Sequence, residues 1–214
     1  MGGVALTELG ERNRERIARR QVDKFAGRRD QLAAAAVRTL AEQGYANTSL
    51  RDIAEHSAFS HGVLHYYFAD KFELITYCVR QYKAKCVQRY DSIVATAATA
   101  DQLLAEVGTA MAGSLRDDAA MHRLWYDMRN QSQFEERFRP DVSDIDRSLE
   151  QMIWRIVSRY AELAGRPCAV SPGLAYALAD GVFQQALLAY LSGAPAAIDQ
   201  FGANMRQVLP SLLA

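Results

Sequence analysis

The sequence predicts an all-α protein, because its breakers are few and its apolar residues recur at helical spacing. The 214 residues include only 5 prolines and 13 glycines, which leaves long stretches uninterrupted. No segment shows the sustained apolar–polar alternation of a half-buried strand. Hydrophobic residues make up 50% of the chain, enough to bury a sizeable core. We therefore expect a globular bundle of helices.

The first predicted helix begins at Arg28. Leu32, Ala36 and Leu40 recur every four residues and form its apolar stripe. Gly44 follows the last turn, where glycine commonly ends a helix.

Two short helices and a long one are predicted next. Thr48 marks the start of a second helix at about residues 50–57. Residues 58 and 59 form a break, and Ser60 is a suitable N-cap for a third helix that runs to about residue 67. Asp70 caps a much longer fourth helix.

Five further helices are expected in the rest of the chain. Glycine or proline residues separate them, at Gly113, Pro140, Gly165, Pro167, Pro172, Gly193 and Pro195. The predicted ranges are about 101–114, 117–131, 141–165, 172–192 and 195–212.

A tight break between two short helices is the geometry that a helix-turn-helix needs to read DNA. The major groove, about 12 Å wide, admits one helix, whose N-terminal residues contact base edges. The chain is also basic at this end, with 11 Lys/Arg against 7 Asp/Glu over residues 12–71, and 14 against 16 over residues 72–214. Both observations favour a DNA-binding domain joined to a nearly neutral second domain.

The residues of this region also resemble a known family. The chain reads Thr48-Ser49-Leu50-Arg51-Asp52-Ile53-Ala54-Glu55 and then Phe59-Ser60-His61-Gly62-Val63-Leu64-His65-Tyr66-Tyr67-Phe68-Ala69-Asp70-Lys71. Over about residues 28–75 it resembles the DNA-binding domain of TetR-family regulators. Two positions depart from the family pattern, since Ala58 replaces the usual glycine and Phe59 a small aliphatic residue. The first departure would slightly strain the turn, and the second suggests a bulkier apolar plug.

The resemblance implies a role for each matching residue. Thr48 and Lys71 correspond to phosphate contacts, and Tyr67 either reaches a phosphate or is a half-buried structural tyrosine. Phosphate contacts set register and affinity, whereas base-edge contacts set sequence preference. We expect Arg51 and His61 to choose the sequence and Lys71 to supply salt-dependent affinity. The groove-facing set is Arg51, Ser60, His61, Gly62, His65 and Tyr66.

Three segments follow from these patterns: a charged N-terminal arm (1–27), the helix-turn-helix domain (28–75) and a helical ligand-binding and dimerisation domain (76–214). The arm is either a solvated extension or a basic segment that lies along DNA phosphates or in a minor groove. Its basic residues are Arg12, Arg14, Arg16, Arg19, Arg20 and Lys24.

The C-terminal domain is expected to form a homodimer and to bind a small molecule. The segment 174–191 is apolar on nearly every side, so we expect half of it to be buried against a twin, in a four-helix interface with the helix that follows. The predicted interface residues are Ala175, Ala179, Ala186, Tyr190, Phe201 and Met205. A pocket is expected between the fourth and the middle helices, although ordinary core packing explains each of its residues singly. The predicted lining is Tyr90, Met111, Trp125, Met128, Arg129, Phe134, Met152, Phe183 and Gln184.

Other functions have weaker support in the sequence. His61 and His65 stand four residues apart, but the glutamate that a zinc protease helix needs is replaced by Gly62, and no third ligand follows. No nucleophile elbow, P-loop or dinucleotide fingerprint is present, so we expect no enzyme, metal or cofactor. The three cysteines suggest reduced thiols, and polar residues within 174–191 argue against a membrane span. We expect a cytoplasmic, ligand-responsive repressor that binds a palindromic operator in double-stranded DNA as a dimer. A helical small-molecule-binding or interaction protein that does not read DNA is the alternative.

Overall fold

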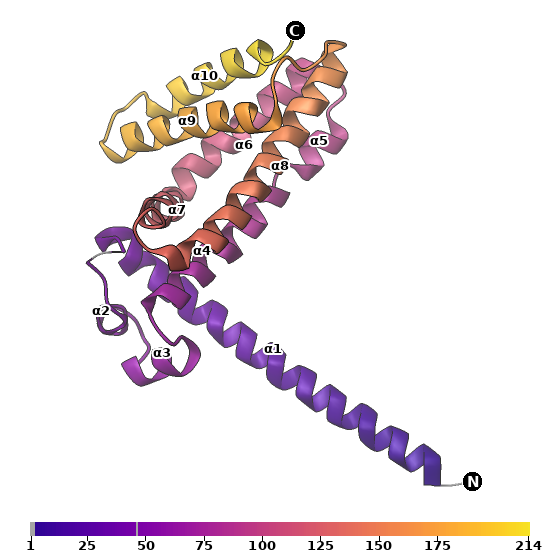
Figure 1. The fold of residues 1–214 in the computed structure, drawn as a ribbon, viewed down its shortest axis with the longest axis vertical. Coiled ribbons are helices and arrows are strands. Elements are labelled where there is room, and N and C mark those ends of the chain that lie inside the picture. Colours follow the sequence, from indigo (N-terminus) through magenta and orange to yellow (C-terminus); the bar gives the residue numbers. More distant parts are fainter. Residues whose placement is uncertain (1–2, 46) are drawn as a thin grey trace.

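A computed structural model of the protein describes residues 3–45 and 47–214, which form helices joined by short loops (Figure 1). No β-strand occurs in these ranges, and the all-α prediction is confirmed. The N-terminal elements are α1 (Gly3–Gln43), α2 (Leu50–Glu55) and α3 (His61–Tyr67). The remaining elements are α4 (Lys71–Gln88), α5 (Asp91–Thr96), α6 (Ala100–Asp117), α7 (Ala119–Gln131), the 3₁₀ turn η1 (Glu136–Phe138), α8 (Arg139–Ala164), α9 (Pro172–Leu191) and α10 (Ala197–Ser211).

Helix α1 starts far earlier than the predicted Arg28. It begins at Gly3, so most of the predicted arm is helical, while residues 1 and 2 lie outside the described residues. The sequence of residues 4–27 contains no proline and is rich in Arg, Ala and Glu, which favour helix. Apolar periodicity reports the burial of one face, so it does not detect a helix that is exposed on every side. Residues 19–28 are indeed all exposed.

The first three helices share one small core with the start of α4. Leu32 and Leu40 of α1, Ile53 of α2 and Leu64 of α3 are completely buried, as is Phe68. Each short helix therefore depends on tertiary packing, because isolated helices of this length are unstable in water. This core fixes the angle at which α3 is presented.

Helices α4 to α10 form the second, larger unit, called the body here. α9 packs against α8 and α10, and α10 also packs against α6 (Figure 1). The body differs from the sequence prediction in two features. Gly113 lies inside α6 and does not end it, and α5 was not anticipated. Among the helices that the structure describes, none is both long and apolar enough to cross a membrane.

Candidate DNA-binding surface and internal cavity

Short polar side chains fix the ends of α2 and α3. The Ser49 hydroxyl accepts a hydrogen bond from the Asp52 backbone N–H at 3.2 Å, and the Asp52 carboxylate accepts one from the Ser49 N–H at 2.7 Å. This reciprocal capping box lowers the pKa of Asp52 through its hydrogen bonds with Ser49. Ser60 caps α3 as predicted, accepting from Val63 N–H at 3.3 Å. The N-cap of α2 is therefore Ser49. The Ser-x-x-Asp spacing in the sequence is the pattern that identifies this capping box.

Helix α3 presents an exposed face of hydrogen-bonding side chains. His61, Gly62, His65 and Tyr66 are all exposed, and Tyr66 keeps 73% of its surface. The Nε2 atoms of His61 and His65 are 3.1 Å apart. Leu64, on the opposite side of the helix, is buried. The structure thus brings together most of the predicted groove-facing set on one surface.

The two predicted phosphate contacts, Thr48 and Lys71, face the protein instead of solvent. Thr48 is 2% exposed, and its hydroxyl donates to the Gly44 carbonyl at 2.7 Å. The Lys71 ammonium donates to the Tyr45 carbonyl at 2.6 Å and lies 4.1 Å from the centre of the Tyr45 ring. Partial burial lowers the pKa of Lys71. Both side chains therefore hold the loop after α1, and their contacts with phosphates stay a prediction.

Two other predicted contact residues differ in their freedom. Arg51 is exposed, and its ion pair with Glu55, at 3.0 Å between Nε and Oε1, is a surface pair of small energetic weight. Tyr67 is half-buried, and its ring centroid lies 4.6 Å from that of Phe25 on α1. The structural interpretation of Tyr67 therefore explains its position. Sequence reasoning missed Phe25, whose ring also meets that of Tyr66, at 6.2 Å.

The two departures from the family pattern cause no backbone strain. No described non-glycine residue has a positive φ, so Ala58 occupies its turn in an ordinary conformation, contrary to the expected strain. Phe59 is half-buried, with the Arg28 guanidinium 4.7 Å above its ring. Phe59 thus joins the turn to α1, which agrees with its predicted role as a plug.

A dense set of contacts joins the DNA-binding unit to the body. Gly44 ends α1 with a φ of 76°, and the N–H of Tyr45 then donates to the Asp127 carboxylate at 2.6 Å. The Tyr45 hydroxyl donates to Glu135 at 3.1 Å, and burial raises its pKa to about 12. Arg137 bridges to Asp70, the N-cap of α4, at 2.6 Å. Helix α7 and the turn after it therefore hold the base of the DNA-binding unit.

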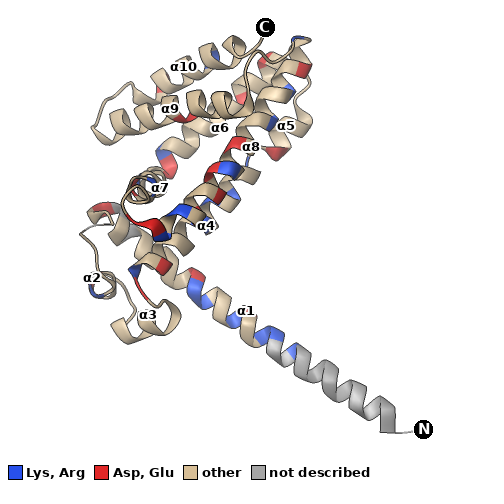
Figure 2. Ribbon diagram, in the orientation of Figure 1, with Lys and Arg blue, Asp and Glu red and all other residues tan. Residues whose placement is uncertain are grey.

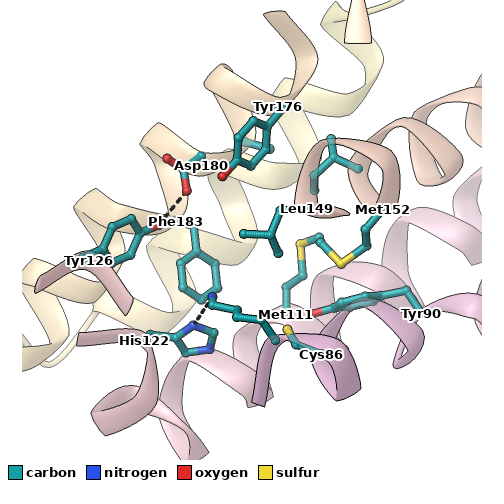
Figure 3. Close-up of a pocket in the computed structure, with 13 residues that line it drawn as sticks. Cys86, Tyr90, Met111, His122, Tyr126, Leu149, Met152, Tyr176, Asp180 and Phe183 are labelled. Carbon is teal, nitrogen blue, oxygen red and sulfur yellow. Dashed lines mark hydrogen bonds between the residues drawn. The ribbon is translucent and has the colours of Figure 1, made fainter. Parts of the chain in front are cut away.

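The body encloses a cavity of about 60 Å³ between α4, α6, α7, α8 and α9 (Figure 3). Apolar and aromatic side chains make most of its wall, and only a few polar groups interrupt them. The lining residues are Lys83, Cys86, Tyr90, Met111, His122, Tyr126, Leu149, Met152, Ile153, Tyr176, Ala179, Asp180 and Phe183.

One polar group of the cavity is a lysine buried beside a histidine. Lys83 is 4% exposed, and its Nζ lies 3.5 Å from Nδ1 of His122. Desolvation lowers the pKa of Lys83 to about 8, and desolvation together with the Lys83 charge lowers that of His122 to about 2. His122 is therefore neutral. Its Nε2 lies 3.0 Å from both the Ser114 and the Tyr82 hydroxyls.

The other polar group is an acid that is already paired. Asp180 accepts a hydrogen bond from the Tyr126 hydroxyl at 2.9 Å and one from Arg129 Nη1 at 2.5 Å. Arg129 Nε is also 3.4 Å from Asp146, which accepts from the Tyr176 hydroxyl at 2.6 Å. Burial beside these carboxylates raises the pKa of both tyrosines, so they act as hydrogen-bond donors.

The cavity brings together part of the predicted pocket lining. Tyr90, Met111, Met152 and Phe183 line the cavity, and Arg129 supports it from behind Asp180. Trp125 and Met128 are buried in the core outside the lining. Phe134 is 83% exposed, so its prediction is wrong. Gln184 lines a separate surface groove of about 360 Å³ beside Tyr45 and Asp127. Sequence reasoning missed Lys83, His122 and Asp180, which lie on three helices far apart in the chain.

The predicted dimer interface is also corrected. Most of its residues are buried inside one subunit, with exposed fractions of 0% for Ala175, 7% for Ala179, 8% for Ala186, 1% for Phe201 and 3% for Met205, while Tyr190 is half-buried. The outer face of α9 instead carries exposed leucines. Leu174, Leu178 and Leu188 lie on one stripe, at i, i+4 and i+14, and are 49%, 42% and 55% exposed.

Comparison with known proteins identifies the N-terminal unit. Residues 32–78 match the family of bacterial regulatory proteins, tetR family, so the predicted resemblance is confirmed. No curated protein sequence matches the chain.

Solved structures share the whole fold at low sequence identity. A TetR-family transcriptional regulator from Rhodococcus sp. has a TM-score of 0.69 at 16% identity, over 88% of this chain and 100% of that chain. A transcriptional regulator from Saccharomonospora viridis in complex with choline has a TM-score of 0.72 at 17% identity, over 88% and 98%. FadR from Bacillus subtilis in complex with stearoyl-CoA has a TM-score of 0.64 at 18% identity, over 86% and 97%.

Proposed function

We propose that this chain, a DNA-binding transcriptional regulator with a TetR-type domain at residues 32–78, is a ligand-responsive repressor. It binds a palindromic operator as a homodimer. The observation that carries the proposal is the exposed polar face of α3, displayed by a buried core on a short, doubly capped helix-turn-helix. The exposed side chains of α3 contact little of the subunit, and a single helix of this kind fits a major groove.

Within this surface, base reading is assigned to Arg51, His61, His65 and Tyr66, with Ser60 and Gly62 at the start of α3. Arg51 and the histidines offer N–H donors toward base edges, and their side chains are exposed. At Gly62 an added Cβ would meet no atom of the protein within 4 Å, so the helix surface is open there for DNA to approach closely. Thr48 and Lys71 support the loop behind this surface.

Phosphate contacts are assigned to the exposed stretch of α1 before residue 28. Arg19, Arg20 and Lys24 are exposed, and Figure 2 shows several basic residues, in blue, along this part of the helix. The rings of Phe25, Tyr66 and Tyr67 pack together, which places this stretch of α1 beside the recognition helix. A basic helix next to α3 would lie along the DNA phosphate backbone that flanks the major groove.

Assembly into a dimer is assigned to the outer face of α9. A stripe of half-exposed leucines on a helix of 20 residues is an apolar surface of the kind that a second subunit covers. Half-sites on one face of DNA lie about 34–36 Å apart and require two readers. The dimer supplies the second copy of α3, and its two-fold symmetry explains a palindromic operator.

The response to a ligand is assigned to the internal cavity, because two of its walls reach the DNA-binding unit. Helix α7 lines the cavity with His122 and Tyr126 and holds the Tyr45 N–H through Asp127. Helix α4 lines it with Lys83 and begins at Lys71, which bonds the same loop. Regulators of this fold have been solved with ligands as different as choline and stearoyl-CoA, so the lining residues, and not the fold, select the effector.

DNA binding is tested by fluorescence anisotropy on fragments flanking the gene, at several salt concentrations. Each neutralised phosphate contributes about −0.9 to the slope of log affinity against log salt. We expect a steep slope on every fragment and one fragment bound far more tightly than the rest. A weak, flat curve on all of them would instead support a helical small-molecule-binding protein that does not read DNA.

A further inference from the structure

The cavity wall carries one cationic group without an anionic partner. Lys83 is buried, and among the described residues no carboxylate forms an ion pair with it. Its Nζ has one long hydrogen bond, of 3.5 Å, to His122 Nδ1, although an ammonium carries three N–H donors. The ring centres of Trp125 and Tyr82 lie 5.3 and 5.7 Å from Nζ. The two ring faces and the more distant charges of Asp180 and Asp146 stabilise the ammonium, but no carboxylate bonds it directly.

The one carboxylate that lines the cavity does not bond this ammonium directly. Asp180 is bound by Arg129 Nη1 at 2.5 Å and by the Tyr126 hydroxyl at 2.9 Å. Arg129 therefore bridges Asp180 and Asp146, and Asp146 also accepts a hydrogen bond from the Tyr176 hydroxyl. Lys83 and Arg129 together balance the charges of Asp180 and Asp146, and Lys83 is the one cation of the lining that no carboxylate bonds directly.

The remaining lining is apolar and adaptable. Leu149, Ile153 and Phe183 give the wall its apolar character, and in Figure 3 Met111 and Met152 lie together beside Tyr90. The volume of about 60 Å³ is well below the roughly 300–1,000 Å³ of typical ligand pockets. A larger guest needs some side chains to move, and unbranched methionines do so readily.

We propose that this cavity binds a small monocarboxylate, with the carboxylate on Lys83 and its apolar part among Met111, Met152 and Phe183. A buried ammonium is costly unless an anion meets it, and a charge-assisted hydrogen bond is about twice as strong as a neutral one. A single available cation suits a monoanion better than a phosphate, because the neighbouring guanidinium of Arg129 is already bonded. Binding to the cavity is measured without DNA. The inference therefore rests on the proposed function only where the bound carboxylate is taken to regulate DNA binding.

The test compares carboxylates with neutral and cationic molecules of similar shape. Acetate, butyrate and hexanoate are titrated into the full-length protein by calorimetry, alongside butyramide, hexanamide and tetramethylammonium. We expect hexanoate or butyrate to bind about ten- to a hundredfold more tightly than its amide. Equal binding of acid and amide, preference for tetramethylammonium, or no saturable carboxylate binding at about 10 mM overturns the proposal.

Two variants locate the binding. Lys83→Met removes the charge at similar length, and we expect the preference for carboxylate over amide to disappear. Lys85→Met, on the exposed side of the same helix, is the matched control and should retain it. Replacing buried charged groups with apolar side chains of similar volume is often neutral or stabilising, and the melting temperature of Lys83→Met checks this directly. If Lys83→Met keeps the preference, the anion binds elsewhere and the proposal is wrong.

The regulatory role is tested separately, by operator affinity with and without hexanoate. If the acid binds through Lys83 but leaves DNA affinity unchanged, the cavity inference holds and the ligand-responsive part of the proposed function fails. If no carboxylate binds while DNA binding is normal, the cavity inference fails and DNA recognition stands.

Discussion

Helices α3 and α9 distribute their polar and apolar residues in opposite ways. In α3 the apolar Leu64 points into the core, and His61, His65 and Tyr66 face solvent. In α9 three alanines, Leu187 and the carboxylate of Asp180 face the interior, while Leu174, Leu178 and Leu188 face solvent. One helix has an ordinary amphipathic surface, and the other is inverted over much of its length.

The inversion indicates two further functions on one helix. Exposed polar residues are ordinary at a protein surface. Those of α3 therefore indicate DNA binding only together with the capped helix-turn-helix that presents them. Exposed leucines and a buried acid are each unusual, and each calls for a partner. On α9 the leucines point to a second subunit, and Asp180 belongs to the polar framework of the cavity.

The largest expected effect separates the two faces of α9 with neighbouring substitutions. Leu178→Arg adds a cation to the exposed stripe, so the isolated subunit should keep its stability within about 0.5 kcal/mol while the dimer is disrupted. Ala179→Arg places the same charge inside the subunit and should cost about 3–5 kcal/mol of unfolding free energy. Sedimentation and thermal denaturation measure the two effects. A dimeric Leu178→Arg protein that binds operator normally would locate the interface elsewhere.

A second experiment examines the buried polar groups of the body through pH. The pKa of His122 is about 2 in the folded protein and 6.5 when exposed, so below about pH 6.5 the unfolded chain binds a proton that the folded one does not. Stability from this residue is present above pH 6.5 and is lost at about 1.4 kcal/mol per unit as the pH falls. We expect the free energy of unfolding to fall by about 2 kcal/mol between pH 6.5 and about pH 5.

Denaturant titrations of His122→Gln check this pH dependence, because glutamine retains hydrogen bonding without titrating. The variant should show a flatter stability profile in that range. His65→Gln, on the exposed face of α3, is the control and should follow the unsubstituted protein. Parallel profiles for all three proteins would mean that His122 is not the group responsible.

A third experiment concerns the exposed face of α3. His61→Ala should reduce discrimination between operator and random DNA by about 1–3 kcal/mol, with stability unchanged within about 0.5 kcal/mol. Lys71→Ala should behave differently, because its ammonium holds the Tyr45 carbonyl. We expect Lys71→Ala to lower the melting temperature without changing the salt dependence of binding. A reduced salt slope for Lys71→Ala would support its predicted role as a phosphate contact.

The smallest expected effect belongs to the basic stretch of α1. Replacing Arg19, Arg20 and Lys24 together with glutamine should reduce the salt slope by about 0.9 for each phosphate that the variant no longer neutralises. Discrimination between operator and random DNA should not change, because phosphate contacts do not read bases. Arg206→Gln, on the exposed face of α10, is the control. If the triple variant keeps the full slope, this part of α1 is a solvated extension.

Short-range patterns in the chain were enough to place α2, α3 and the start of α4, although they missed the start of α1. Gly44, Ser60 and Asp70 mark element ends through their own backbone preferences and short side chains, and the structure places all three at those ends. The N-cap at Ser60 fixes where α3 begins, and the buried Leu64 fixes which side of it faces the core. The exposed residues of α3 follow from these two positions. These interactions span a few residues, so a linear pattern contains them.

Packing between distant helices set the remaining features. Lys83, His122 and Asp180 meet only because α4, α7 and α9 pack together, and no spacing along the chain encodes that meeting. Thr48 and Lys71 match the family pattern, but their contacts with Gly44 and Tyr45 turn them inward. Helix α9 is apolar on nearly every side, so its sequence offers no polar face to show which side is buried. Ala175, Ala179, Ala186 and Leu187 fit against the neighbouring helices, and Leu174, Leu178 and Leu188 are left outside.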